Sequence, residues 1–216
     1  MRRATTPARI SIDELVVAAE PAAWQRAGFA VADRIAEVGT VRVRLAGSDA
    51  GRGLVSWSLR GADPTQLDGL PTEPSERPPV AGPRHPNGVV SVDHVVVFSP
   101  NLDRTAAALQ EAGLDLRRIR EEPTPAGAPR QAFFRLGEVI LEVIQAPDGS
   151  PLLADPEGPA RLWGISFLVD DLGATAEALG DQLGDPRDAV QAGRTIATAR
   201  REAELGLAVA FMTPAA

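Results

Sequence analysis

The chain has 216 residues, of which 44% are hydrophobic and 24% charged, so it can bury a core and lacks the polar composition typical of disordered chains. It contains no Cys, Lys or Tyr and only two His, which excludes disulfides, thiolate nucleophiles, zinc–cysteine sites and lysine Schiff bases. With 22 arginines against 29 acidic residues and a net charge of −7, it has no basic excess for binding nucleic-acid phosphates.

The longest apolar runs have the length of a strand, and no apolar stretch follows the two arginines near the N-terminus. We therefore expect a cytoplasmic protein. Its expected partner is a small molecule, and neither nucleic acid nor a membrane.

The first predicted unit begins with a strand over Ile10–Val17, which is rich in β-branched residues. Only Pro21–Ala27 is available for a helix before Gly28, so that helix must be short. Two further strands are predicted over Val41–Leu45 and Leu54–Leu59.

The segment Gly61–Gly88 contains seven prolines, including Pro78 and Pro79, which favour extended backbone and resist helix or interior strand. It is predicted to be a linker or strap. The alternative is an ordered loop that wraps the surface, because long structureless connections are unusual within one domain.

A second unit follows, and its first strand, Val90–Val97, repeats the pattern of Ile10–Val17 at a distance of 80 residues. Asn101 offers a helix cap, the apolar residues of the next ten positions recur at helical spacing, and Gly113 stands where the helix should end. Strands are predicted over Gln131–Leu136 and Val139–Ile144.

The third unit repeats this order more weakly. A strand over Leu162–Val169 precedes a helix that is capped at Asp170 or Asp171, carries apolar residues to Leu183 and ends at Gly184. The strands predicted next are Thr195–Arg200 and Leu207–Met212. Each unit is therefore β-α-β-β, with one further strand expected in the less regular stretches.

Tandem units of this kind resemble the vicinal oxygen chelate superfamily, which includes glyoxalases, bleomycin-resistance proteins and extradiol dioxygenases. The resemblance rests on the opening strand and helix cap Val92–Asp103, the closing strand Gly137–Val143 and the next opening strand Gly164–Leu172. It implies an α+β fold in which paired βαβββ modules form a cup, with an extra shortened N-terminal module. The implied domains are a shortened module at 8–60, a Pro-rich linker at 61–88 and a glyoxalase-like domain at 89–214, itself made of modules 89–147 and 160–214.

In this family the opening and closing strands of each module supply one metal ligand each. The resemblance places His94 and Glu142 at these positions in the second module, whereas the third module has Gly164 and Ala210. Two protein ligands bind a metal far more weakly than three or four. Glu14, the counterpart of His94 in the first unit, could complete a site if the first and second modules, or two chains, face each other.

Glu142 stands out from the residues alone, because it interrupts an apolar strand and must be paired, ligating, solvated in a cavity or protonated. Arg135 is the expected partner, since Gln131, Phe133 and Arg135 share one face of the preceding strand. An ion pair between Glu142 and Arg135 that lines a cup is the simplest interpretation.

Trp57 and Trp163 are expected to pack in the core or between modules. Met212 is expected either in the core or on the wall of an apolar pocket. The open edges of an incomplete first module require a partner, so we expect that module to pack on the main domain or to pair in a homodimer.

Two functions from different classes remain. The first is metal-independent binding of a small organic ligand, without a cofactor, by the residues that would line the cup: Gln131, Phe133, Arg135, Ser166 and Met212. The second, implied by the resemblance, is a metal-dependent lyase, isomerase or dioxygenase in which His94 and Glu142 hold Zn, Fe, Mn or Ni and Glu142 is the catalytic residue that moves the proton.

Overall fold

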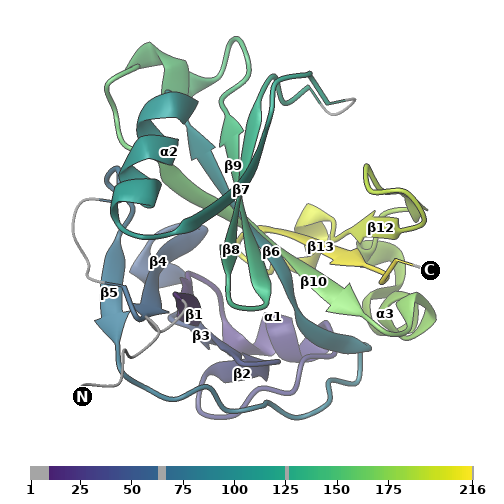
Figure 1. Cartoon of the computed structure of the whole chain (residues 1–216). Helices are drawn as coiled ribbons and strands as arrows, with labels where there is room; N and C mark the ends of the chain where they lie inside the picture. Colours follow the sequence, from purple (N-terminus) through teal and green to yellow (C-terminus); the bar gives the residue numbers. More distant parts are fainter. Residues whose placement is uncertain (1–9, 63–66, 125–126, 216) are drawn as a thin grey trace, which may run out of the picture.

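A computed structural model describes residues 10–62, 67–124 and 127–215 of the chain (Figure 1). These residues form two β-sheets and three short α-helices, which confirms the predicted α+β class. Sheet A contains β1 (Ser11–Val17), β2 (Ile35–Val38), β3 (Val41–Leu45), β4 (Leu54–Arg60) and β5 (Thr72–Ser75). Sheet B contains β6 (Val89–Ser99), β7 (Asp115–Arg120), β8 (Gln131–Leu136), β9 (Val139–Gln145), β10 (Arg161–Val169), β11 (Arg187–Asp188), β12 (Thr195–Thr198) and β13 (Ala208–Met212).

The helices are α1 (Pro21–Arg26), α2 (Leu102–Glu111) and α3 (Leu172–Leu179), with 3-10 turns at Ser48–Ala50, Pro151–Ala154, Gly180–Gln182 and Arg201–Ala203. The cap of α2 is the one predicted, because the Asn101 side chain accepts a hydrogen bond from the Arg104 backbone N–H. The predicted end of α3 at Gly184 is wrong. The helix stops at Gly180, where φ is +53°, and a 3-10 turn follows.

Sheet B consists of two βαβββ units placed side by side. Its strand order is β11-β12-β13-β10-β6-β9-β8-β7, so each opening strand, β6 or β10, lies at the centre beside the other. The closing strands β9 and β13 run parallel to β6 and β10 respectively. The strands that the sequence left unassigned are β7 and β11, at the two edges of the sheet.

Sheet A reproduces the five central strands of sheet B. Its order, β2-β3-β1-β4-β5, matches β8-β9-β6-β10-β13, and every neighbouring pair has the same relative direction in the two sheets. Strand β4 therefore does not close the first unit, as the sequence suggested, but lies antiparallel beside β1, as β10 lies beside β6.

The two sheets also share their irregularities. The extra residue of a β-bulge is Asp13 in β1 and Asp93 in β6. The extra residue of a second β-bulge is Val55 in β4 and Trp163 in β10. Because a bulge re-aims the side chain of its extra residue, these four side chains depart from the alternation of a regular strand.

The sheets pack face to face around one hydrophobic core. Trp24 and Phe29 of the N-terminal half contact Phe167 of β10, and Phe29 also lies 6.4 Å from Phe211 of β13. The other face of each sheet points away from this core. We call the face of sheet B that carries His94, Glu142 and Met212 the cup face, and the face of sheet A that carries Glu14 and Arg44 the outer face.

The proline-rich segment is held against both sheets where the structure describes it. Thr72–Ser75 forms β5, and the His85 ring accepts a hydrogen bond from the Ala30 N–H and donates one to the Glu37 carbonyl. Asp68 binds Arg104 of α2 through both carboxylate oxygens. The division of the chain at residues 60 and 88 stays a prediction, and residues 8, 9 and 63–66 lie outside the described residues.

Candidate functional site

Three polar side chains meet on the cup face of sheet B. His94 comes from β6, Glu142 from β9 and Gln131 from β8. The His94 Nε2 atom lies 3.6 Å from Glu142 Oε2, and the Gln131 amide nitrogen donates to Glu142 Oε1. The sequence placed these three residues in one site, and the fold brings them together.

Asp93 orients the His94 ring. Its carboxylate lies 2.7 Å from His94 Nδ1 and also accepts a hydrogen bond of 2.5 Å from Arg194, whose Nε donates to the Thr213 carbonyl. Since Nδ1 carries the proton given to Asp93, His94 Nε2 presents its lone pair to the cup. Sequence reasoning missed Asp93 because neighbours in a strand normally face opposite sides, and only the bulge brings Asp93 beside His94.

The pKa values of the two carboxyl groups of this cluster are shifted in opposite directions. Burial raises the pKa of Glu142, and the opposing effects of the neighbouring His94 and of the Gln131 hydrogen bond do not cancel it. Burial also acts to raise the pKa of Asp93, but the hydrogen bonds from His94 and Arg194 outweigh it and hold that pKa below its usual range. The cup thus holds one carboxyl group that favours its neutral form beside one that favours its charge.

A cavity of about 1000 Å³ opens over this cluster. Of the residues predicted to line it, Gln131, Phe133 and Met212 do so, together with His94 and Glu142. Trp163 also lines it and is 46% exposed, so it is not a core residue but packs between modules against Phe98, whereas Trp57 is buried as expected. The bulge in β10 explains the difference, because it turns Trp163 toward Phe98 at 4.9 Å between ring centres.

The predicted ion pair between Arg135 and Glu142 does not form. Arg135 is exposed and lies opposite Ile140, near the turn between β8 and β9. Glu142 stands opposite Phe133, two pairs further along the ladder. Both Gln131 and Arg135 were within diagonal reach, and Gln131 is the one that points into the cavity and bonds to the carboxylate.

Ser166 lies on the cup face, directly opposite His94 and beside Ala210, but it is almost fully buried and is not part of the cavity wall. Its hydroxyl oxygen has no hydrogen-bond partner among the described residues. The fold therefore places Ser166 beneath the site rather than in it.

The wall also contains three arginines that sequence reasoning missed: Arg118 and Arg120 of β7 and Arg187 of β11. The guanidinium carbon of Arg118 lies 5.0 Å from the centre of the Phe133 ring. Their strands are the two of sheet B that the sequence left unassigned, so the sequence offered no face on which to place them.

Few side chains in the cup could act as metal ligands. The counterparts of the family's remaining ligands, Gly164 and Ala210, carry no donor atom, and the described residues contain no group of three His, Cys, Asp or Glu side chains able to hold an ion. Glu14 does not complete the set within the chain. It lies on the outer face of sheet A, where Arg42 and Arg44 bind its carboxylate at 3.0 and 2.9 Å.

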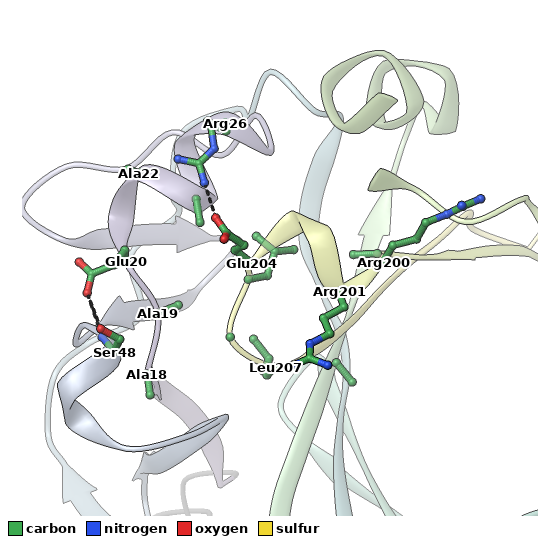
Figure 2. A pocket seen from close by; sticks show the side chains of 15 residues that line it. Ala18, Ala19, Glu20, Ala22, Arg26, Ser48, Arg200, Arg201, Glu204 and Leu207 are labelled. Carbon is green, nitrogen blue, oxygen red and sulfur yellow. Dashed lines mark hydrogen bonds and ion pairs between the residues drawn. The ribbon is translucent and has the colours of Figure 1, made fainter. Parts of the chain in front are cut away.

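A second hollow of about 900 Å³ lies where the two halves of the chain meet (Figure 2). Its wall is built mainly from alanines of the β1–α1 connection and from the turn that precedes β13, and Arg26 pairs with Glu204 across its rim at 2.9 Å. None of the predicted site residues lines it.

No helix among the described residues is long and apolar enough to cross a membrane. The profile of the Glyoxalase/Bleomycin resistance protein/Dioxygenase superfamily matches residues 93–198. No curated protein matches the chain.

Solved structures share the fold. A mutant of 4-hydroxymandelate synthase from Streptomyces coelicolor is similar over 98% of this chain and 94% of its own, with 15% identity and a TM-score of 0.59. Methylmalonyl-CoA epimerase from Mycobacterium tuberculosis is similar over 60% of this chain and 91% of its own, with 18% identity and a TM-score of 0.48. At these identities the likeness concerns the fold alone.

Proposed function

Since the chain belongs through residues 93–198 to the Glyoxalase/Bleomycin resistance protein/Dioxygenase superfamily, also called the vicinal oxygen chelate superfamily, we propose that its cup binds a small organic ligand without a metal. The observation that carries the proposal is the cup itself: a cavity of about 1000 Å³ in which a compact polar cluster lies beside apolar and aromatic side chains. Among the described residues no three His, Cys, Asp or Glu side chains gather to hold an ion, and of the pair His94 and Glu142, Glu142 is engaged by Gln131.

In this proposal each polar residue has a separate task. His94, held by Asp93, offers an acceptor at Nε2, and the neutral form of Glu142 offers a donor. Phe133 and Met212 supply apolar wall, while Arg135 and Ser166, which lie outside the wall, have no direct contact with a ligand. Location in the cytoplasm and assembly as a homodimer remain predictions.

The second candidate is a metal-dependent lyase, isomerase or dioxygenase, and one distance favours it. His94 Nε2 and Glu142 Oε2 are 3.6 Å apart without a hydrogen bond between them. Two ligand atoms at about 2.1 Å from one tetrahedral ion lie roughly 3.4 Å apart, so the pair could hold Zn, Fe, Mn or Ni with two protein ligands. Such an ion would act as a Lewis acid, and Glu142 would be the residue that moves a proton.

The experiment that separates the two candidates is elemental analysis of protein purified without chelator, together with thermal melts in Mn, Fe, Ni and Zn. Metal-independent binding predicts substoichiometric metal and no rise in melting temperature that depends on both His94 and Glu142. One metal per chain, with a rise that His94→Ala and Glu142→Ala each abolish, would overturn it in favour of the second candidate. Arg135→Ala serves as the matched control, because Arg135 lies on the same face but outside the cavity.

A further inference from the structure

Two of the most exposed apolar side chains of the described residues lie at the mouth of the cup. Four large apolar side chains are strongly exposed, and two of them, Trp163 at 46% and Val190 at 60%, line this cavity. The edge-to-face contact with Phe98 fixes the Trp163 ring, which leaves an indole surface bare to the cavity. An exposed aromatic surface at the mouth of a cavity is suited to a flat apolar ligand.

The cup wall also carries positively charged side chains that form no ion pair within the described structure. Ten arginines elsewhere in the described residues form ion pairs, but Arg118, Arg120 and Arg187 on the cavity wall form none. Two acidic residues, Glu122 and Asp188, also reach this wall, yet neither pairs with these arginines in the described structure. In a chain of net charge −7, such free guanidinium groups favour an anionic ligand.

Arg118 is the best placed of the three. Its guanidinium lies over the Phe133 ring, so the aromatic contact holds the charge against the wall and leaves its N–H groups free. A carboxylate bound there would therefore sit beside an aromatic surface.

The cup also contains a buried hydrogen-bond acceptor, the Gln131 amide oxygen. Gln131 is only 7% exposed, its amide nitrogen is used by Glu142, and its amide oxygen has no partner among the described residues. A buried carbonyl oxygen without a donor is costly, so a ligand that donates a hydrogen bond at this point gains affinity.

From these three features we infer that the cup takes a planar aromatic carboxylate that carries a hydroxyl or N–H donor on its ring system. The carboxylate pairs with Arg118, the ring lies against Trp163, and the donor reaches the Gln131 amide oxygen. This inference rests on the proposed binding function and adds the chemical class of the ligand. The cavity volume of about 1000 Å³ has room for a fused two-ring compound.

The test uses four probes with the full-length protein and isothermal titration calorimetry. The full probe is 6-hydroxy-2-naphthoate. 6-Methoxy-2-naphthoate lacks the donor, 2-naphthol lacks the anion, and decanoate lacks the ring. We expect the full probe to bind at least tenfold more tightly than each of the others.

Variants assign each part of the ligand to its residue. Arg118→Met should weaken the two naphthoates about tenfold and leave 2-naphthol unchanged, whereas Arg117→Met, on the same strand but paired with Asp115 outside the cavity, should change nothing. Trp163→Ala should weaken every ring compound, and Trp163→Phe should restore most of that loss. Gln131→Leu should make 6-hydroxy-2-naphthoate and 6-methoxy-2-naphthoate bind with equal affinity.

Failure of the ligand class is distinguishable from failure of the binding function. A screen of neutral and aliphatic compounds by thermal shift is run beside Ile144→Trp, which fills the cavity. If such compounds bind and Ile144→Trp abolishes their binding, or if all four probes bind equally, the aromatic-anion class is wrong and the cup still binds ligands. If neither the screen nor the probes give binding that Ile144→Trp removes, both proposals are overturned.

Discussion

The outer face of sheet A and the cup face of sheet B present the same strand positions with different side chains. Where sheet B has His94 and Glu142, sheet A has Glu14 and Arg44 at the corresponding register. The shared bulge carries Asp13 in one sheet and Asp93 in the other. The backbone frame is therefore the same, and the side chains alone make the two faces different.

In sheet A the charged groups pair with one another. Asp13 binds Arg42, Arg60 and Ser75, and Glu14 binds Arg42 and Arg44, so long guanidinium side chains cover the face. In sheet B the polar groups keep unused capacity, above all the Gln131 amide oxygen. The comparison shows that a cup needs more than its strand order: it needs side chains that leave a cavity over the face, with a polar group such as the Gln131 amide oxygen still unpaired.

The largest expected effect comes from removing the bulged carboxylate of sheet A. Asp13→Ala removes the carboxylate that Arg42 and Arg60 share and leaves Arg60, a mostly buried charge, without an acidic partner, and such a loss costs about 3–5 kcal/mol. Asp93→Ala should cost clearly less, because Asp93 pairs with one arginine, Arg194, whereas Asp13 pairs with two. Urea unfolding of both variants measures the difference, and equal losses would contradict the contrast between the two faces.

Neutralising Glu14 of sheet A and Glu142 of sheet B should change stability in opposite directions. Glu14→Gln loses its ion pairs with Arg42 and Arg44 and should destabilise the protein by about 1–3 kcal/mol. Glu142→Gln should stabilise it by about 1 kcal/mol at pH 8, because burial raises the pKa of Glu142 and so opposes its ionisation.

The effect of Glu142 on stability should depend on pH, because its pKa is raised. With a folded pKa above the ordinary 4.5, Glu142 favours the folded state below pH 4.5 and loses that contribution as the pH rises through the folded pKa. The advantage of Glu142→Gln should therefore vanish in melts near pH 4. An advantage of the same size at pH 4 and pH 8 would show that ionisation is not its cause.

The strap between the sheets should respond to acid through His85. Burial lowers the pKa of His85, so its contribution to stability is present above about pH 6.5 and is lost as the pH falls through the folded pKa. The protonated ring could no longer accept the Ala30 N–H bond. Melts from pH 8 to pH 5 should show a loss of at most about 1.4 kcal/mol per pH unit, which His85→Gln removes and His94→Gln retains.

The smallest effect is expected where the two halves meet at the surface. The Arg26–Glu204 pair is 57% and 70% exposed, so Arg26→Ala should change the free energy of unfolding by no more than about 0.5 kcal/mol. Urea unfolding at low and high salt measures it. A loss above 1 kcal/mol would mean that this pair helps to hold the two sheets together.

Much of the fold was predictable because its signals are local. β-Branched runs, the Asn101 cap and the 80-residue repeat predicted the opening strands β1 and β6, the helix α2 and the closing strand β9. The edge strands β7 and β11 were not predicted, because β7 is rich in arginine and β11 has only two residues. Strand β5 contains a proline and forms only because β4 offers it an edge.

The sequence by itself determined three polar residues of the cup face: strand alternation singled out Gln131 and Glu142, and the family resemblance of the repeat placed His94 with Glu142. Only the tertiary structure decided which of them bond. Gln131 rather than Arg135 reaches Glu142, Asp93 joins His94 through a bulge, and Trp163 turns into the cavity through another. Alternation is a property of one strand, whereas bulges and diagonal contacts arise from the register between strands, which only the packed sheet fixes.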